Sequence, residues 1–123
     1  IVHDQDTCDC RALKHELVEL AKPFDKMVLV RIACHELEAW YWGDLAAVST
    51  AYSKDVTSYA NRSAYRIPDQ IVNPKQEFLR LFPEHQQISG AEKISEYMVA
   101  ERNCSQSFQM LITGVKELVK NAM

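Results

Sequence analysis

The alternation of apolar and polar residues over the first third of the chain predicts a strand, a helix and a second strand. The short apolar stretch at residues 1–3 predicts the end of a buried strand, and residues 7–22 carry apolar side chains at helical spacing. Pro23 should end that helix. Residues 27–34 are almost continuously apolar, as in a buried parallel strand. Such a βαβ unit predicts two parallel strands.

The rest of the chain has mainly helical periodicity. A second helix should run from about residue 35, with a break near Gly43, to residue 52. Residues 53–72 are polar and aperiodic, which predicts an exposed loop. We therefore expect a single α/β domain over 1–123, with a βαβα core at 1–52, this loop, and a helical part at 73–123.

Several residues in this helical part indicate where individual helices should begin. Asn73-Pro74 predicts the start of a short helix, with Pro at its first position. The spacing of Ser89 and Glu92 is that of a capping box. A last amphipathic helix should begin near Ser105.

Composition and charge narrow the classes of protein. The net charge of −3 argues against a protein that wraps nucleic acid by bulk electrostatics, but leaves room for a nuclease whose metal ions add positive charge. No stretch approaches the roughly 20 apolar residues of a membrane span, and we expect no signal peptide. The four cysteines are few and irregularly spaced, so we expect reduced thiols and a cytoplasmic protein. Because the chain opens inside a strand without a Met, we expect a fragment that lacks its N-terminal strand or strands.

Asp4 and Asp6 are the leading candidates for chemistry. Two residues apart at the end of a strand, they point to the same side of the pleat, where open α/β sheets bind ligands. Paired carboxylates suit a hard cation such as Mg²⁺. The alternative for Asp6 is an N-cap of the following helix, which would leave Asp4 unexplained.

Glu36 follows the second strand at the same edge and is the candidate further ligand. It is equally well explained as a first-turn glutamate that the helix dipole favours. If the helix starts at residue 35, Glu36 and Glu38 lie about 200° apart around it and cannot share a face.

Other candidates have simpler structural explanations. The residues that could hold zinc instead are His3, Cys8, Cys10 and His35, although Cys-x-Cys is not a usual zinc spacing and buried thiols are the simpler explanation. Trp40 and Trp42, with Tyr41, could stack on bases, but large aromatic residues at helical spacing more often belong to the core, and we favour the core for at least Trp40. Ser105 could cap the last helix, or that helix start could bind phosphate. Lys14 and Arg31 are weak candidates for phosphate contact.

Several motifs together resemble an uncharacterised bacterial family of domains of unknown function. The matching motifs, in chain order, are Asp4-Gln5-Asp6 with Asp9-Cys10 and Leu13-Lys14, Arg31-Ile32-Ala33 leading to Glu36–Trp40, Gly43-Asp44, Ser89–Ile94 and Asn103–Phe108. That family is similar to the Toprim catalytic domain of topoisomerases, primases and overcoming-lysogenization-defect (OLD) nucleases. Its members are often encoded beside AAA-type ATPases, in settings of phage defence or mobile elements.

The resemblance implies a function and a partner. Asp4 and Asp6 match the Toprim Asp-x-Asp, which binds Mg²⁺ in active relatives, while the Toprim glutamate would lie on a strand before this chain begins. We therefore expect a Mg²⁺- or Mn²⁺-dependent phosphodiesterase, namely a nuclease that acts on nucleic acid with an ATPase partner. Asp4, Asp6 and Glu36 would be its catalytic and metal-binding residues. The alternative is a catalytically inactive module that docks on a partner ATPase.

Overall fold

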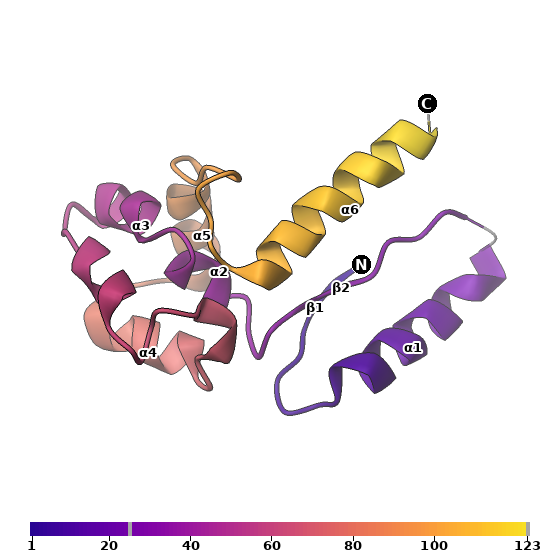
Figure 1. Ribbon diagram of the computed structural model, residues 1–123, viewed down its shortest axis with the longest axis horizontal. Helices are drawn as coiled ribbons and strands as arrows, with labels where there is room; N and C mark the ends of the chain where they lie inside the picture. Colours follow the sequence, from indigo (N-terminus) through magenta and orange to yellow (C-terminus); the bar gives the residue numbers. More distant parts are fainter. Residues whose placement is uncertain (25, 123) are drawn as a thin grey trace.

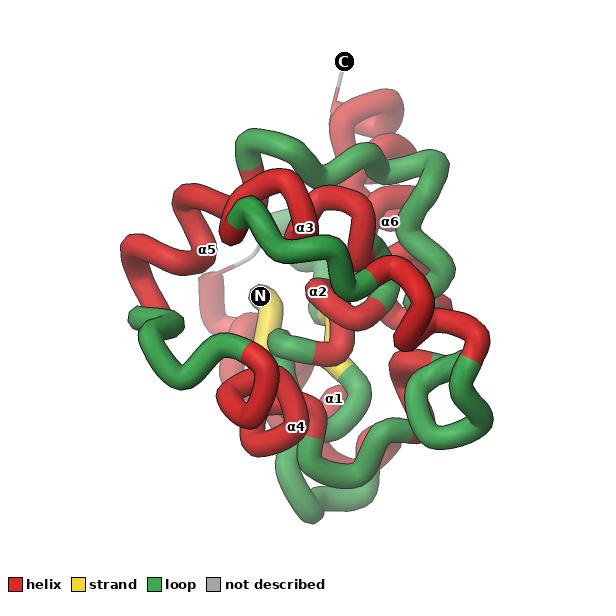
Figure 2. Tube along the Cα trace, turned by 90° about the vertical axis from the view of Figure 1, so that its left-hand side faces the viewer, coloured by secondary structure: helices red, strands yellow, loops and turns green. Residues whose placement is uncertain are grey.

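The computed structural model describes residues 1–24 and 26–122, and these residues form a mixed α/β structure (Figures 1 and 2). The elements are, in order, β1 (Val2–Asp4), α1 (Cys10–Ala21), η1 (Lys22–Phe24), β2 (Arg31–Ala33), α2 (Ala39–Trp42), α3 (Leu45–Tyr52), η2 (Thr57–Asn61), η3 (Pro68–Gln70), α4 (Pro74–Leu81), α5 (Gln87–Ser95) and α6 (Gln106–Ala122). Among the described residues, no helix is long and apolar enough to cross a membrane.

The two strands form the parallel pair that the sequence predicts. Val2 pairs with Arg31 and Asp4 with Ala33, and the ladder continues beyond the strands through a hydrogen bond from the Gln5 N–H to the Ala33 carbonyl at 3.0 Å. Both α1 and α6 contact β2, and the sheet lies between these two helices in Figure 1. β2 is shorter than predicted because only Arg31–Ala33 find partners on β1.

The prediction of two buried strands is wrong at the amino ends. Val2 and Met27 are 51% and 58% exposed, whereas Ile32 and Ala33 are buried. Helix α6 covers β2 closely, since a Cβ on Gly114 would lie only 2.8 Å from Nη2 of Arg31. Apolar character alone does not bury a strand, because burial also requires a covering element.

The main hydrophobic core lies among α2, α3, α4 and α5. Its largest fully buried side chains include Trp42, Phe78 and Phe82, and Trp40 is also buried, so the prediction that these tryptophans belong to the core is confirmed. Residues 53–72 are not simply an exposed loop. They contain η2 and η3 and contribute Val56 and Ile71, 1% and 5% exposed, to the core.

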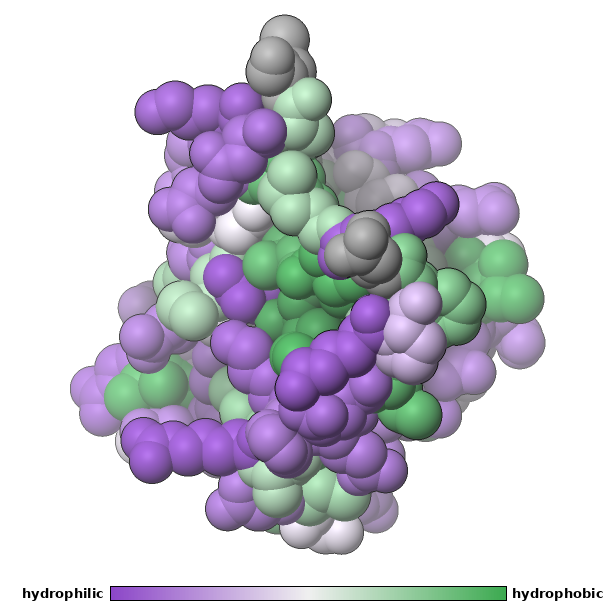
Figure 3. All heavy atoms as spheres, turned by 90° about the vertical axis from the view of Figure 1, so that its right-hand side faces the viewer, coloured by the Kyte–Doolittle hydropathy of each residue, from purple (hydrophilic) through white to green (hydrophobic). Residues whose placement is uncertain are grey.

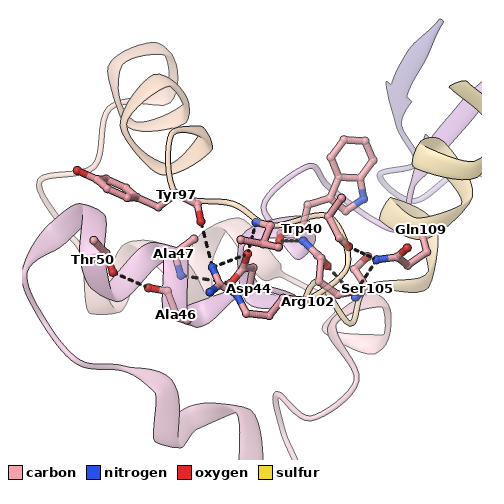
Figure 4. A network of polar contacts seen from close by, with 12 residues as sticks. Trp40, Asp44, Ala46, Ala47, Thr50, Tyr97, Arg102, Ser105 and Gln109 are labelled. Carbon is pink, nitrogen blue, oxygen red and sulfur yellow. Dashed lines mark hydrogen bonds and ion pairs between the residues drawn. The ribbon is translucent and has the colours of Figure 1, made fainter. Parts of the chain in front are cut away.

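A close joint connects the α2–α3 turn to the segment before α6 (Figure 4). A Cβ on Gly43 would lie 2.0 Å from Oδ1 of Asn103, so only glycine fits there. Asp44 caps α3 by accepting a hydrogen bond from the Ala47 N–H, and it also accepts one from Nε of Arg102 at 2.7 Å. Two motifs about 60 residues apart in the sequence thus meet in one packed contact.

Candidate metal-binding site

Asp4 and Asp6 lie where the sequence places them, at the carboxyl ends of the parallel strands. Oδ1 of Asp4 accepts a hydrogen bond from the Leu37 N–H at 2.8 Å, which ties the end of β1 to the turn after β2. The Asp6 N–H donates to the His35 carbonyl at 2.6 Å, and both residues have a positive φ, 53° for Asp6 and 62° for His35. Strained backbone of this kind is common at functional sites.

The alternative explanation of Asp6 as a helix cap is wrong. Helix α1 begins at Cys10, and its N-cap is Asp9, whose Oδ1 accepts a hydrogen bond from the Ala12 N–H at 2.9 Å. Asp6 lies three residues earlier and is exposed. Its carboxylate is therefore available to a ligand.

Both aspartates open into one cavity of about 720 Å³, which we call the acidic cavity. The lining residues are Val2, His3, Asp4, Asp6, Leu37, Glu38, Tyr41, Gln87, Ile88, Ala91 and Glu92. Strand β1 supplies Asp4, the loop after it Asp6, the turn before α2 Glu38, and α5 Glu92. Since no lysine or arginine is among the described residues that line it, the cavity favours a cation.

Glu38 is a site residue that the sequence did not identify. Glu38 lines the acidic cavity, although the residue as a whole is only 5% exposed. Burial raises the pKa of Glu38 above its ordinary value, and the negative charges of Glu36 and Asp4 raise it further, against opposing effects of its own backbone N–H and Lys75.

Tyr41 adds a neutral hydroxyl to the same cavity. It is 5% exposed, and burial together with the charge of Glu38 and the neighbouring Tyr52 raises the pKa of Tyr41 to about 12. The phenol therefore stays protonated at neutral pH and can donate a hydrogen bond.

Glu36 lies away from the acidic cavity. It lines an adjoining cavity of about 280 Å³, and its Oε1 accepts a hydrogen bond from the Lys75 N–H at 3.3 Å. Asp6 lines both cavities. Asp4, Asp6 and Glu38 therefore line one cavity, whereas Glu36 shares only the adjoining cavity with Asp6.

The four residues considered for zinc are spread over three cavities. His3 lines the acidic cavity, Cys8 and His35 line the adjoining cavity, and Cys10 lines a third. The cysteines are also less buried than expected, because Cys8, Cys10 and Cys104 are exposed. Over residues 1–24 and 26–122, no three His, Cys, Asp or Glu side chains converge closely enough to enclose a metal ion.

Comparison with known protein families places the chain in one of them. The sequence profile of the domain of unknown function DUF4276 matches residues 4–116. The chain belongs to the DUF4276 family. No curated protein and no solved structure matches it significantly.

In this DUF4276 domain the start of α6 is occupied by a carboxylate. Asp69 accepts hydrogen bonds from the Ser107 N–H at 2.7 Å and from Oγ of Ser105 at 2.6 Å, and Oγ of Ser105 accepts one from the Phe108 N–H. Ser105 is therefore a cap, as predicted, and Asp69 fills the place that a phosphate would take.

Two other sequence signals have structural explanations in the DUF4276 domain. Arg31 donates through Nε to the Met110 carbonyl at 2.9 Å, which holds α6 against β2. The predicted capping box at Ser89 and Glu92 is wrong, because α5 begins earlier, at Gln87, and Ser89 lies within the helix.

Proposed function

We propose that this DUF4276 domain is a Mg²⁺- or Mn²⁺-dependent phosphodiesterase, acting as a nuclease, in which Asp4 and Asp6 bind the metal. The sequence suggests Glu36 as a further ligand, but Glu36 lines the adjoining cavity and accepts the Lys75 N–H, so we leave it out of the metal site. The resemblance to Toprim domains supports the same activity, with a nucleic acid as substrate and an ATPase as partner.

One observation carries the proposal. Asp4 and Asp6 open together into an acidic cavity at the carboxyl ends of parallel strands. Such a cavity would repel a phosphodiester by itself, and a divalent cation would reverse that repulsion. Two carboxylates suffice for Mg²⁺, which usually keeps several waters and completes its coordination with substrate phosphate oxygens.

In this proposal the metal and the residues around it would have separate roles. A bound Mg²⁺ would polarise a phosphoryl oxygen and make an attacking water more acidic. Asp4 is held in place by the Leu37 N–H, so its carboxylate is oriented before a ligand arrives. Tyr41, kept neutral by burial, can donate a hydrogen bond into the cavity.

The test uses Asp4→Asn and Asp6→Asn, which remove charge and leave the backbone intact. Asparagine at residue 4 keeps an oxygen for the Leu37 N–H, and asparagine tolerates the left-handed conformation at residue 6. We expect saturable Mg²⁺ binding in calorimetry and metal-dependent cleavage of DNA or RNA by the wild type, both lost in the double variant. Identical binding curves for wild type and variant would refute the metal site.

A second function, a catalytically inactive module that docks on an ATPase, is favoured by a different observation. Apolar side chains gather on the side of the molecule shown in Figure 3, around a groove of about 390 Å³ between the amino ends of the strands and α6. Its exposed residues include Val2, Val28 and Val115. If the Asp4→Asn variant binds the ATPase fully and the wild type cleaves nothing with any metal, this second function is the better account.

A further inference from the structure

Glu38 has an unusual environment for an acidic side chain. It is 5% exposed, and no other described residue donates a hydrogen bond or an ion pair to its carboxylate. Withdrawing a carboxylate from water costs several kcal/mol unless something compensates for the lost hydration, so buried charges in proteins are normally paired or bind metals. Among the described residues, its own backbone N–H and the charge of Lys75 compensate only in part, because burial and the charges of Glu36 and Asp4 still leave the pKa of Glu38 raised.

Glu38 shares the acidic cavity with Asp4. The Leu37 N–H that holds Oδ1 of Asp4 belongs to the residue next to Glu38. The turn at 35–38 and the end of β1 thus present two carboxylates on one wall. Two like charges side by side are unfavourable without a cation between them.

We infer that Glu38 and Asp4 together bind the divalent cation, and that Glu36 does not. This inference rests on the proposed function, because it assigns a ligand to the same metal. Mg²⁺ usually takes one or two protein carboxylates directly and keeps several waters, so Asp6 would bind it through one of those waters.

Glu36 provides a matched control two residues away. It carries the same side chain, but its Oε1 already accepts the Lys75 N–H and it faces the adjoining cavity. A charge effect on metal binding that is merely long-range would be similar for both glutamates. Replacing a direct ligand should weaken metal binding far more than replacing a residue that acts only through its charge.

The experiment measures Mn²⁺ binding to the protein by electron paramagnetic resonance and Mg²⁺ binding by calorimetry. The proteins compared are the wild type, Glu38→Gln, Glu36→Gln and Asp4→Asn. We expect Glu38→Gln and Asp4→Asn each to weaken binding by about tenfold or more, whereas Glu36→Gln stays close to the wild type. Circular dichroism confirms that each variant is folded. Should Glu38→Gln fail to fold, Glu38→Asp keeps the charge but retracts it, and should weaken binding as well.

The outcomes separate this inference from the proposed function. If Asp4→Asn loses the metal while Glu38→Gln binds it like the wild type, the inference is wrong and the proposed function stands. If Glu36→Gln weakens metal binding as strongly as Glu38→Gln, the inference that Glu38 and not Glu36 binds the metal is wrong. If the wild type binds neither ion, the metal site and the proposed function fail together.

Discussion

Asp44 should be among the most sensitive positions for stability, although it lies outside the candidate site. Its side chain is fully buried and accepts hydrogen bonds from the Ala47 and Val99 N–H groups and from two nitrogens of Arg102 (Figure 4). Asp44→Ala removes all of these contacts at once. The amino end of α3 and the segment before α6 would then no longer be held together through Asp44.

The cost can be worked out contact by contact. Loss of the N-cap costs about 1 kcal/mol. Loss of the hydrogen bond from Val99 to a charged acceptor costs about 1.5–3 kcal/mol. Arg102 is 45% exposed and can return to water, so the ion pair itself adds about 0–1 kcal/mol. We therefore expect Asp44→Ala to lower the free energy of unfolding by about 2.5–5 kcal/mol.

Urea unfolding followed by circular dichroism measures this quantity, provided that the m-value is unchanged. Arg102→Gln is the control, because Asp44 then keeps its two backbone donors, and it should cost less than half as much. The double variant should be about as stable as Asp44→Ala alone, within roughly 0.5 kcal/mol. A loss from Asp44→Ala below about 1 kcal/mol, or fully additive losses, would refute this reasoning.

Three further predictions concern other positions. Glu38→Gln should stabilise the protein increasingly as pH rises above about 4.5, because the raised pKa of Glu38 makes its ionisation unfavourable in the folded state; parallel unfolding curves at all pH values would contradict this. Burial lowers the pKa of His85 below 6.5, so stability should fall as pH falls below that value, and His85→Gln should remove this part of the pH dependence in thermal melts. Gly43→Ala should cost about 2 kcal/mol or more in urea unfolding, since its Cβ would overlap Asn103, whereas an unchanged midpoint would show that the joint can adapt.

Periodicity predicted the parts of the fold that depend on local sequence. The parallel βαβ unit, the break at Gly43 and the core tryptophans all follow from spacing and residue type, and the structure has them. Burial was predicted less well, because it depends on which elements cover each other. Val2 is apolar but only half covered, and Val56 is buried within a segment whose composition predicts a loop.

The candidate site shows why one residue escaped prediction. The argument that Glu36 and Glu38 lie on opposite faces assumed a helix from residue 35. In the structure, His35 has a positive φ and α2 starts only at Ala39, so Glu36 lies in a turn before the helix and the helical spacing does not relate it to Glu38, the N-cap residue. A left-handed histidine leaves no clear signal in sequence periodicity, and the position of Glu38 depends on it.

The left-handed backbone at Asp6 has an evolutionary consequence. Few side chains tolerate this conformation, and apart from glycine the best suited are asparagine and aspartate. A single-base change from aspartate to asparagine would therefore keep the turn while removing one of the acidic cavity's charges. Descendants of an active ancestor could lose cleavage in one step and retain the fold. An active enzyme and a catalytically inactive docking module could then be related by descent and differ by a single substitution.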